Sequence, residues 1–425
     1  MKTLLKNARV LTLENKNIVF ASLVIEDDII AYIGNDVSSY APFDKEIDCE
    51  QNLIMPSFKN CHAHAPMVFL RSGNDTLKLE EWLFDFVFPL EKKLLEKPED
   101  IYYLTKLAFL EYLSGGVSTS IEMYYGSPYI EKAAKDMGFR LVMGSDYLKG
   151  TFDHDTIYNN FVNHQIDDMC KYAITIHSVY VPEESDIEVV NKLVHELKTP
   201  LYFHNSETKR EVENCKNLHD GLTPTEYYYN RGLLDYGAVC YHCAHLSNHD
   251  FEIFKEKDIT FVTCPGSNMK LASGIADIKK ALELGINVAI GTDGASSNNN
   301  LDMFKEMTLV AGLQKLKYDD PLALDPYDVL LMATKNASKA LRINDIDTLA
   351  VNKKADLIMI DLSKPNMLPI VNIINNLVYS GSKDVVKMTM VNGKILYYNN
   401  EFFVGEDVNT IYQKAQEITD KLTLK

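Results

Sequence analysis

The chain has 425 residues, of which 46% are hydrophobic and 24% are charged, a composition typical of a folded protein rather than a disordered one. Its formal net charge of -17 at pH 7 argues against a protein that follows nucleic-acid phosphates, because such proteins gain most of their affinity from a basic surface. The N-terminal segment alternates apolar and polar residues without the apolar core of a signal peptide, and no run of about 18 apolar residues follows. We therefore expect a cytoplasmic protein whose partner is a small molecule, with no nucleic acid and no membrane.

Seven cysteines are scattered along the chain. An odd and scattered set does not form a disulfide framework, and reduced thiols fit the cytoplasm. Cys240 and Cys243 form a C-x-x-C pair, but the pair lies inside an apolar run and the chain has no second pair of this kind. We interpret both as buried structural cysteines.

Both ends of the chain predict short strands. Residues 1–55 contain apolar runs separated by polar turns at hairpin spacing, and residues 346–425 repeat this pattern with a hairpin turn at Asn392-Gly393. We predict one small β-sandwich domain built from these two segments, followed by an amphipathic terminal helix.

The middle of the chain, residues 56–345, alternates β-branched runs with helix-like segments, which is the pattern of strand-helix units around a parallel sheet. Eight such units are typical of a (β/α)8 barrel. The predicted fold class is therefore α/β, a TIM barrel with a small β-sandwich domain formed by both chain ends. The predicted barrel strands cover residues 53–61, 117–123, 140–146, 172–179, 201–205, 238–243, 259–264 and 287–292.

In a barrel of this kind, functional side chains lie at the carboxyl ends of the strands. His62 and His64 follow the first predicted strand, and their spacing of two points both rings to the same side. Two imidazoles aimed together could share a metal ion. Taken alone, the pair is equally well explained as two polar residues of a loop.

Three further strand ends carry residue types that bind a divalent metal or work beside one. The fifth predicted strand ends with His204 and, three residues later, Glu207; the sixth ends with His242 and the eighth with Asp293. A bound divalent ion lowers the pKa of a water from about 15.7 toward about 7, and a nearby carboxylate can then carry its proton to a leaving group. We expect Glu207 to be that carboxylate. The predicted metal ligands are His62, His64, His204 and Asp293.

Several motifs in this order resemble the amidohydrolase superfamily, and specifically its methylthioadenosine/S-adenosylhomocysteine deaminase branch. They are "MPSFKNCHAHAPMVFLRSGNDTLKLEEWLFDFVFPLE", "FHNSETKREV", "HCAHL", "CPGSNMKLASGIADI" and "GTDGASSNNNLDMF". The resemblance covers nearly the whole chain, because "KKADLIMIDL" and the other end segments are similar to the composite β-sandwich of that family. It implies a (β/α)8 barrel with one catalytic divalent metal, zinc rather than iron, although the ligand set accepts either. The implied reaction replaces the adenine 6-amino group of a purine nucleoside with oxygen and releases ammonia.

The resemblance also assigns roles to individual positions, beginning with the same four metal ligands. Glu207 falls on the proton shuttle, His242 on the histidine that holds or polarises the attacking hydroxide, and Asp293 would also accept a proton from that water. Glu91 falls where the branch places a carboxylate for the ribose hydroxyls, since two acceptor oxygens suit a vicinal diol. Without the resemblance, Glu91 would be interpreted as a solvated acid at a helix start. His177 falls on a substrate-facing histidine.

The segment after the third predicted strand departs from the branch. Members that accept S-adenosylhomocysteine resemble one another in placing arginines there, where a guanidinium can pair with the carboxylate of the amino acid. Here Ser145 follows the strand, and no arginine precedes Asn159. Lys149 could supply a point charge, although three aspartates nearby would oppose an anion, namely Asp146, Asp153 and Asp155. We expect adenosine, 5'-methylthioadenosine or 5'-deoxyadenosine to be better substrates than S-adenosylhomocysteine.

Three other features bear on the site. The fourth predicted strand has no lysine that could bridge two metals, which favours one metal. Trp82, the only tryptophan, is expected beside the substrate pocket as a packing anchor rather than a catalytic group. His245 is expected to face away from the site and to have a structural role.

Two alternatives stay open at the level of sequence. One is an aminohydrolase of the same fold that acts on a free base such as guanine or on a triazine-like ring, in which case Glu91 would have no sugar to bind. The other is a metal-binding scaffold without catalysis. The sequence decides neither the rank order of nucleoside substrates nor whether the chain forms a homo-oligomer.

Overall fold

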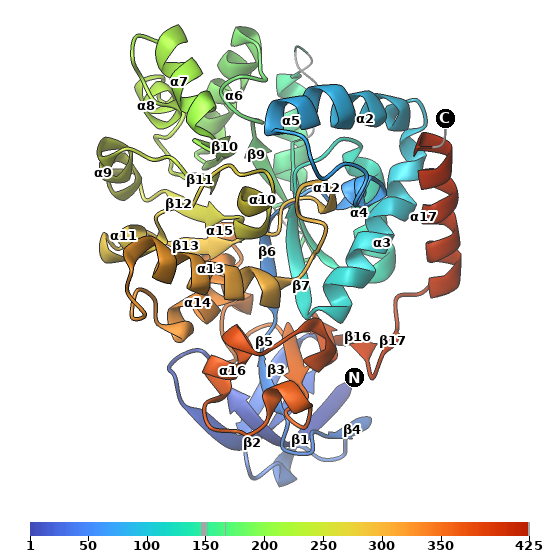
Figure 1. Ribbon diagram of the computed structural model, residues 1–425. Coiled ribbons are helices and arrows are strands. Elements are labelled where there is room, and N and C mark those ends of the chain that lie inside the picture. The colour runs from blue at the N-terminus through green and yellow to red at the C-terminus, as the bar shows by residue number, and fades with distance from the viewer. Residues whose placement is uncertain (146–149, 151, 166, 424–425) are drawn as a thin grey trace.

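The computed structural model describes residues 1–145, 150, 152–165 and 167–423 and has two parts (Figure 1). Within these residues, an eight-stranded parallel sheet curls into a barrel, and a nine-stranded mixed sheet from both chain ends lies at one end of it. The terminal helix α17 (Val408–Thr423) packs on the barrel helix α3 (Ile101–Ser114). The predicted fold class is confirmed.

The barrel strands are hydrogen-bonded in the order β13-β12-β11-β10-β9-β8-β7-β6. Nearly every residue in them is buried, as expected for parallel strands covered by helices. The first and last strands approach each other where the backbone N–H of Asp293 donates to the carbonyl of His62 at 2.9 Å. The bounds are β6 (Phe58–Ala63), β7 (Val117–Glu122), β8 (Arg140–Gly144), β9 (Cys170–Thr175), β10 (Leu201–Asn205), β11 (Ala238–His242), β12 (Thr260–Thr263) and β13 (Val288–Ile290).

Helices separate the barrel strands and cover the outside of the barrel (Figure 1). A long insertion after β6 contains η2 (Ala65–Leu70), α1 (Leu79–Glu81), the π-helix η3 (Trp82–Val87), α2 (Phe88–Leu95) and η4 (Pro98–Asp100). The remaining helices are α4 (Ser127–Met137), α5 (His154–Asn163), α6 (Glu184–Leu197), α7 (Lys209–Leu218), α8 (Pro224–Asn230), α9 (Asn248–Glu256), α10 (Pro265–Lys270), α11 (Ile278–Glu283), α12 (Ala295–Asn298), α13 (Met303–Tyr318), α14 (Pro326–Met332), α15 (Lys335–Leu341) and α16 (Ile373–Tyr379). Short turns of 3-10 helix are η1 (Ser38–Tyr40), η5 (Asn344–Ile346), η6 (Pro365–Met367) and η7 (Lys383–Val385).

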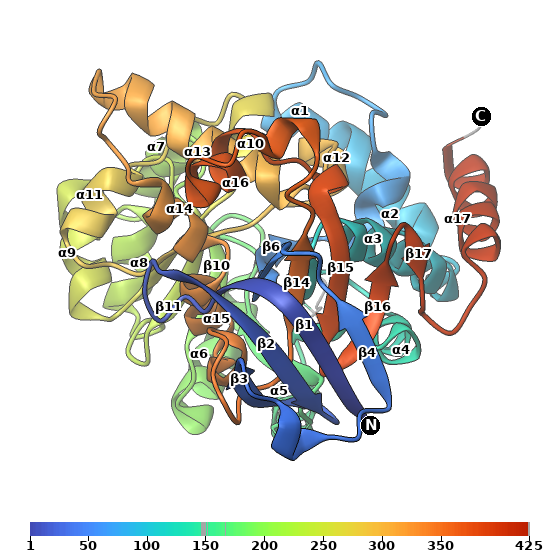
Figure 2. The same cartoon turned by 90° about the horizontal axis from the view of Figure 1, so that it is seen from below.

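The mixed sheet runs in the order β17-β16-β15-β14-β5-β1-β2-β3, with β4 paired to β1 (Figure 2). The hairpin expected at Asn392-Gly393 is present between β15 and β16, and both turn residues have positive φ, 49° and 74°. Glycine is required at the second position because a Cβ there would lie 1.9 Å from the carbonyl oxygen of Asp27. The bounds are β1 (Lys2–Leu11), β2 (Ile18–Glu26), β3 (Ile29–Gly34), β4 (Lys45–Asp48), β5 (Leu53–Pro56), β14 (Leu357–Ile360), β15 (Val386–Val391), β16 (Lys394–Tyr398) and β17 (Glu401–Phe402).

The first predicted barrel strand, residues 53–61, is two strands. Its first half, β5, pairs with β1 and β14 in the mixed sheet, and the chain then passes through Ser57 into β6 of the barrel. The whole run is buried, so its hydrophobic pattern does not mark where the chain leaves one sheet for the other. The fourth predicted strand also ends early, since β9 stops at Thr175. The predicted domain boundaries, 1–55, 56–345 and 346–425, stay a prediction.

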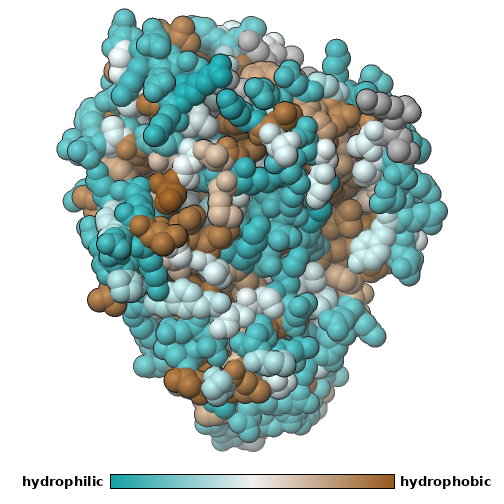
Figure 3. All heavy atoms as spheres, viewed as in Figure 1, coloured by the Kyte–Doolittle hydropathy of each residue, from teal (hydrophilic) through white to brown (hydrophobic). Residues whose placement is uncertain are grey.

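The face in Figure 3 is mostly hydrophilic and the cysteines are free, as expected from the composition. On this face, apolar side chains lie in separate small patches. The seven cysteines are free, and all except the half-buried Cys170 are buried. In the described part of the chain, no helix combines the length and the apolar character needed to cross a lipid bilayer.

A buried ion pair joins the barrel to the mixed sheet. Arg140, at the start of β8, donates from Nε and Nη2 to the two carboxylate oxygens of Asp356 at 2.8 and 2.9 Å, and the two side chains are 1% and 0% exposed. The same carboxylate accepts the backbone N–H of Asn392 at 2.8 Å. The Arg140 guanidinium holds the pKa of Asp356 below its usual range although burial alone would raise it.

We expect Asp356→Ala to lower the free energy of unfolding by about 3–5 kcal/mol, because it leaves the guanidinium of Arg140 buried without its partner. Chemical denaturation measures the change. The control is Glu46→Ala, which removes the exposed Lys6–Glu46 pair and should cost at most about 1 kcal/mol. An equal loss of unfolding free energy in the two variants would contradict the view that the buried pair stabilises the junction between the barrel and the mixed sheet.

Candidate active site

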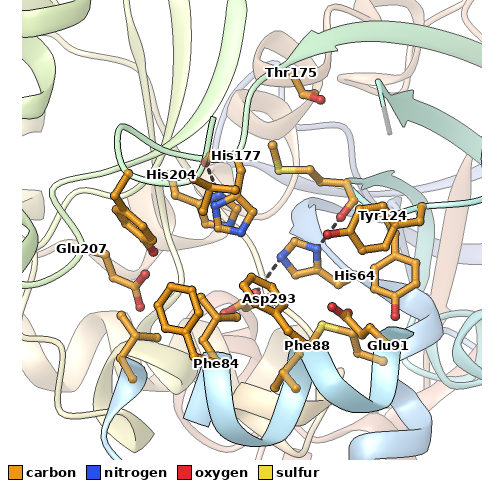
Figure 4. A pocket seen from close by; sticks show the side chains of 18 of the residues that line it. His64, Phe84, Phe88, Glu91, Tyr124, Thr175, His177, His204, Glu207 and Asp293 are labelled. Carbon is orange, nitrogen blue, oxygen red and sulfur yellow. Dashed lines mark hydrogen bonds and ion pairs between the residues drawn. The ribbon is translucent and has the colours of Figure 1, made fainter. Parts of the chain in front are cut away.

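A cavity of about 530 Å³ lies at the carboxyl end of the barrel (Figure 4). This volume is typical of sites that bind small molecules. Its floor is formed by residues at the strand ends, and one wall is formed by apolar side chains of the insertion after β6, among them Phe84 and Phe88. The cavity therefore has a polar floor and a largely apolar wall.

Three histidines meet at the floor. Ring nitrogens of His62, His64 and His204 lie within 4.8 Å of one another. The Nδ1 of His64 is 2.5 Å from the carbonyl oxygen of Met123, and the Nδ1 of His204 is 2.6 Å from that of His177. A carbonyl oxygen can only accept, so both Nδ1 atoms carry the proton. In its neutral form, each ring then presents an unprotonated Nε2, which is the usual arrangement of histidines that bind a metal.

Asp293 completes this cluster. Its Oδ1 lies 3.4 Å from Nε2 of His62 and 3.2 Å from Nε2 of His64. Its Oδ2 accepts hydrogen bonds from the hydroxyls of Ser267 and Ser297 at 2.6 and 2.7 Å. Burial alone would raise the pKa of Asp293, but its close contacts with His62 and His64 hold it well below its usual range. The carboxylate is therefore ionised and fixed in orientation.

The cluster fits a divalent cation. Within the described residues, neither ring nitrogen of His62 has a hydrogen-bond partner, although the side chain is fully buried. Burial lowers the pKa of His62 to about 3, so the ring is neutral. Imidazole nitrogens and an ionised carboxylate that converge in this way have the donor chemistry that zinc or iron(II) accepts.

A second carboxylate lies beside the cluster. Glu207 follows β10 and is buried, and this burial raises its pKa. Its Oε2 is 3.8 Å from Nε2 of His242. The Nδ1 of His242 is 2.8 Å from the side-chain oxygen of Asn268, which fixes the ring. His242 has a positive φ of 66° at the end of β11, a conformation that is uncommon for a residue with a side chain and is often found at functional sites.

Glu91 lies across the cavity from Glu207 (Figure 4). It comes from α2 and is 5% exposed, so the interpretation of this residue as a solvated acid is wrong. Burial raises its pKa to about 7, although the neighbouring hydroxyl of Tyr124 works in the opposite direction. His177 and Trp82 also line the cavity. Burial lowers the pKa of His177 to about 3, so its ring is neutral.

The segment after the third barrel strand is partly described. Ser145 lines the cavity, and its hydroxyl is hydrogen-bonded to Thr175 rather than free for a ligand. Asp153 caps α5 by accepting the N–H of Thr156. Asp146 and Lys149 lie outside the described residues.

The sequence interpretation did not find the polar residues that hold these side chains. Ser267 and Ser297 bind Asp293, Asn268 binds His242, and Ser273 donates to Glu207 at 3.1 Å. All four lie just after the seventh and eighth barrel strands. This position at the carboxyl ends of strands was the signal in the sequence that could have identified them. His245, expected to have a structural role, is hydrogen-bonded through Nε2 to the carbonyl of Ser273 beside the site.

Comparisons with known proteins agree with this geometry. The family model described as "Amidohydrolase family" matches residues 53–396. The chain is 36% identical over 404 residues to a protein of Thermococcus sibiricus named 5-methylthioadenosine/S-adenosylhomocysteine deaminase, covering 93% of this chain and 94% of that one. A relative of the same name from Thermoanaerobacter pseudethanolicus is 35% identical over 413 residues, with coverage of 94% and 95%. A crystal structure of an adenosine deaminase from Xanthomonas campestris with bound zinc is 27% identical and has a TM-score of 0.92, with coverage of 99% and 98%. The chain belongs to the amidohydrolase family and, with deaminases among its relatives, is a hydrolase that acts on C–N bonds.

Proposed function

We propose that this protein hydrolyses the 6-amino group of an adenosine-type nucleoside, giving the corresponding inosine and ammonia. Its curated relatives are named for deamination of such nucleosides, which supports the reaction. The observation that carries the proposal is the pair of buried carboxylates on two sides of one cavity, Glu207 beside the histidine cluster and Glu91 opposite (Figure 4). The first suits proton transfer at a purine ring, and the second suits a sugar with neighbouring hydroxyls.

One divalent metal, zinc rather than iron, is the proposed cofactor. When bound, it supplies Lewis acidity that makes water nucleophilic at neutral pH. The backbone carbonyls that hold the Nδ1 atoms of His64 and His204 would keep both rings aimed at the ion. The proposed ligands are His62, His64, His204 and Asp293.

Glu207 and His242 are the proposed proton-transfer and orienting groups. Burial raises the pKa of Glu207, so this carboxyl group holds a proton more readily than an exposed one. It can protonate the purine ring while water adds to C6, take a proton from that water, and pass it to the amino group as the C6–N bond breaks and ammonia leaves. The second proton of the water, accepted first by Asp293, returns Glu207 to its protonated form. Asn268 fixes Nδ1 of His242, so Nε2 faces Glu207 and can orient the attacking oxygen. Asp293 would accept the proton that this oxygen gives up.

Glu91, His177 and Trp82 are the proposed substrate contacts. As a carboxylate, Glu91 can accept hydrogen bonds from both ribose hydroxyls. His177 is neutral and can donate one hydrogen bond and accept one without placing a charge beside the purine. Trp82 is almost fully buried at the cavity wall, and its indole N–H has no partner within the described residues. A bound nucleoside would give this donor an acceptor and its ring a packing surface.

We further propose that nucleosides with an uncharged 5' group are preferred over S-adenosylhomocysteine. The position after the third barrel strand is Ser145, which cannot pair with a carboxylate as a guanidinium does, and its hydroxyl is bonded to Thr175. We place the reaction in the cytoplasm, where the free cysteines of this chain stay reduced. The partner is then a free purine nucleoside.

The direct test follows ultraviolet absorbance while metal-quantified protein meets adenosine, 5'-methylthioadenosine, 5'-deoxyadenosine and S-adenosylhomocysteine in parallel. We expect deamination of the three uncharged nucleosides, with a kcat that falls by at least about 100-fold in Glu207→Gln, because the amide cannot transfer the proton. We expect S-adenosylhomocysteine to have a kcat/KM at least about tenfold below that of 5'-methylthioadenosine.

Two results would contradict these proposals separately. Comparable kcat/KM values for S-adenosylhomocysteine and 5'-methylthioadenosine would refute the substrate preference alone. No deamination of any of the four by protein with one metal per chain would refute the nucleoside substrate, and guanine and triazine-like rings would be assayed next.

A second variant tests the sugar contact. Glu91→Gln should raise KM for adenosine by about 10- to 100-fold, because it removes charged hydrogen bonds worth about 1.5–3 kcal/mol. Since the pKa of Glu91 is about 7, we also expect the wild-type KM to fall as pH rises from 6 to 8, as the carboxylate forms. The variant should lose this pH dependence. An unchanged KM for adenosine in Glu91→Gln would show that Glu91 does not hold the sugar.

A further inference from the structure

Ser273 makes a hydrogen bond that the reaction described above does not explain. It lies in the loop after α10, is buried, and donates from its hydroxyl to Oε1 of Glu207 at 3.1 Å. The other carboxylate oxygen, Oε2, is on the side of His242, 3.8 Å from its Nε2. The two oxygens of Glu207 therefore have different surroundings, and only one of them has a hydroxyl partner within the described residues.

We propose that Ser273 is a positioning residue that assigns the transferred proton to Oε2 of Glu207. This inference rests on the proposed function, in which Glu207 moves the proton. A hydroxyl that donates to Oε1 stabilises this oxygen as an acceptor, so a proton on the carboxyl group resides on Oε2. The bond also restricts rotation of the terminal carboxyl group, which in a glutamate is otherwise broadly distributed.

The loop that carries Ser273 is itself fixed to the segment that carries Glu207. The backbone N–H of Ser273 donates to the carbonyl of Asn268 at 2.8 Å, and its carbonyl lies 2.5 Å from Nε2 of His245. The backbone N–H of His245 donates to the carbonyl of Ser206, the residue before Glu207, at 3.0 Å. These bonds form a closed connection from Glu207 through Ser273 and His245 back to Glu207.

Gly274 allows this close packing. It has a φ of 144°, which residues with side chains rarely adopt, and a Cβ at this position would lie 2.7 Å from Nε2 of His245. The loop therefore approaches His245 as closely as it does because residue 274 is glycine. A hydroxyl held on so tightly packed a loop places Oε1 of Glu207 accurately.

A separate hydrogen bond fixes the backbone of Glu207. The N–H of Glu207 donates to Oε2 of Glu211, the first-turn acid of α7, at 2.6 Å. With the backbone held by Glu211, the direction of the Glu207 carboxyl group depends mainly on its side-chain torsions. Ser273 is the described residue that donates to this group from a side chain. Removing the hydroxyl should therefore disturb the carboxyl group without moving the backbone.

The test compares Ser273→Ala with wild-type protein on the best nucleoside substrate. We expect kcat to fall by about 10- to 100-fold, which is part of the roughly 100- to 10,000-fold that general acid-base catalysis contributes, while KM changes by less than about threefold. Metal content and melting temperature should match the wild type. Ser273→Thr, which keeps a hydroxyl, should recover at least about one third of the wild-type kcat.

The matched control is Ser338→Ala. Ser338 is also a fully buried serine, but it lies in α15 and donates to the backbone carbonyl of Thr334 at 3.3 Å. Its substitution tests the cost of deleting any buried hydroxyl, and kcat should stay within about twofold of the wild type. A loss in Ser273→Ala that this control shares would overturn the positioning role.

The remaining outcomes separate this inference from the proposed function. A wild-type chain that deaminates nucleosides together with a Ser273→Ala variant of equal kcat would overturn only the inference. So would a fall in kcat that comes with lost metal, a lower melting temperature or a matching rise in KM, because these changes indicate a structural role. A wild-type chain that deaminates none of the nucleosides would overturn the proposed function and this inference with it.

Discussion

The closure of the barrel is the constraint on which the site depends. His62 and His64 come from the first strand and Asp293 follows the last one, so these side chains meet only because β6 and β13 lie side by side. The contact is close: the N–H of Asp293 binds the carbonyl of His62, and a Cβ at Gly291 would lie 2.6 Å from the Cβ of His62. Residues more than 220 positions apart thus form one cluster, and any change that separates the two strands would separate the cluster as well.

Hydrogen bonds within the protein hold the polar side chains around this cluster in fixed orientations. Backbone carbonyls hold Nδ1 of His64 and His204, two serines hold Asp293, and an asparagine holds His242. The backbone has positive φ at His242 and at Asp293, at 66° and 62°. Such conformations cost free energy and persist where the surrounding structure enforces them. The arrangement suits a reaction that needs donors and acceptors set in place before the substrate arrives.

The sequence was sufficient for the fold class and for the approximate ends of the barrel strands, except the fourth, which ends at Thr175 instead of residue 179. The alternation of strand and helix patterns predicts the barrel. The rule that functional side chains lie at the carboxyl ends of barrel strands predicts that His204, Glu207 and His242 are close together, and all three line one cavity. The hairpin turn at Asn392-Gly393 could also be predicted, because the positive φ angles of such a turn favour these residue types. Such features have local signals or follow from one general rule of the fold.

Other features have no local signal. The uniformly buried run 53–61 does not mark the change from one sheet to the other, and the π-helix that contains Trp82 depends on the packing of the insertion over the cavity. The partners of the site residues depend on loops that come together only in three dimensions. Ser273, for instance, is 66 positions away from the carboxylate it holds. Sequence patterns identify the charged and imidazole groups of a site more readily than the hydroxyls that orient them.

We propose that the cluster built by barrel closure binds one divalent cation. Diffraction from crystals of metal-quantified protein, with data collected at the zinc and iron absorption edges, tests it most directly. We predict a single anomalous peak about 2.0–2.2 Å from ring nitrogens of His62, His64 and His204 and from an oxygen of Asp293. His62, His242 and Cys264 also bring ligand atoms within 4.8 Å of one another. A peak bound by these three residues instead, or no peak at the cluster in crystals supplied with both metals, would contradict it.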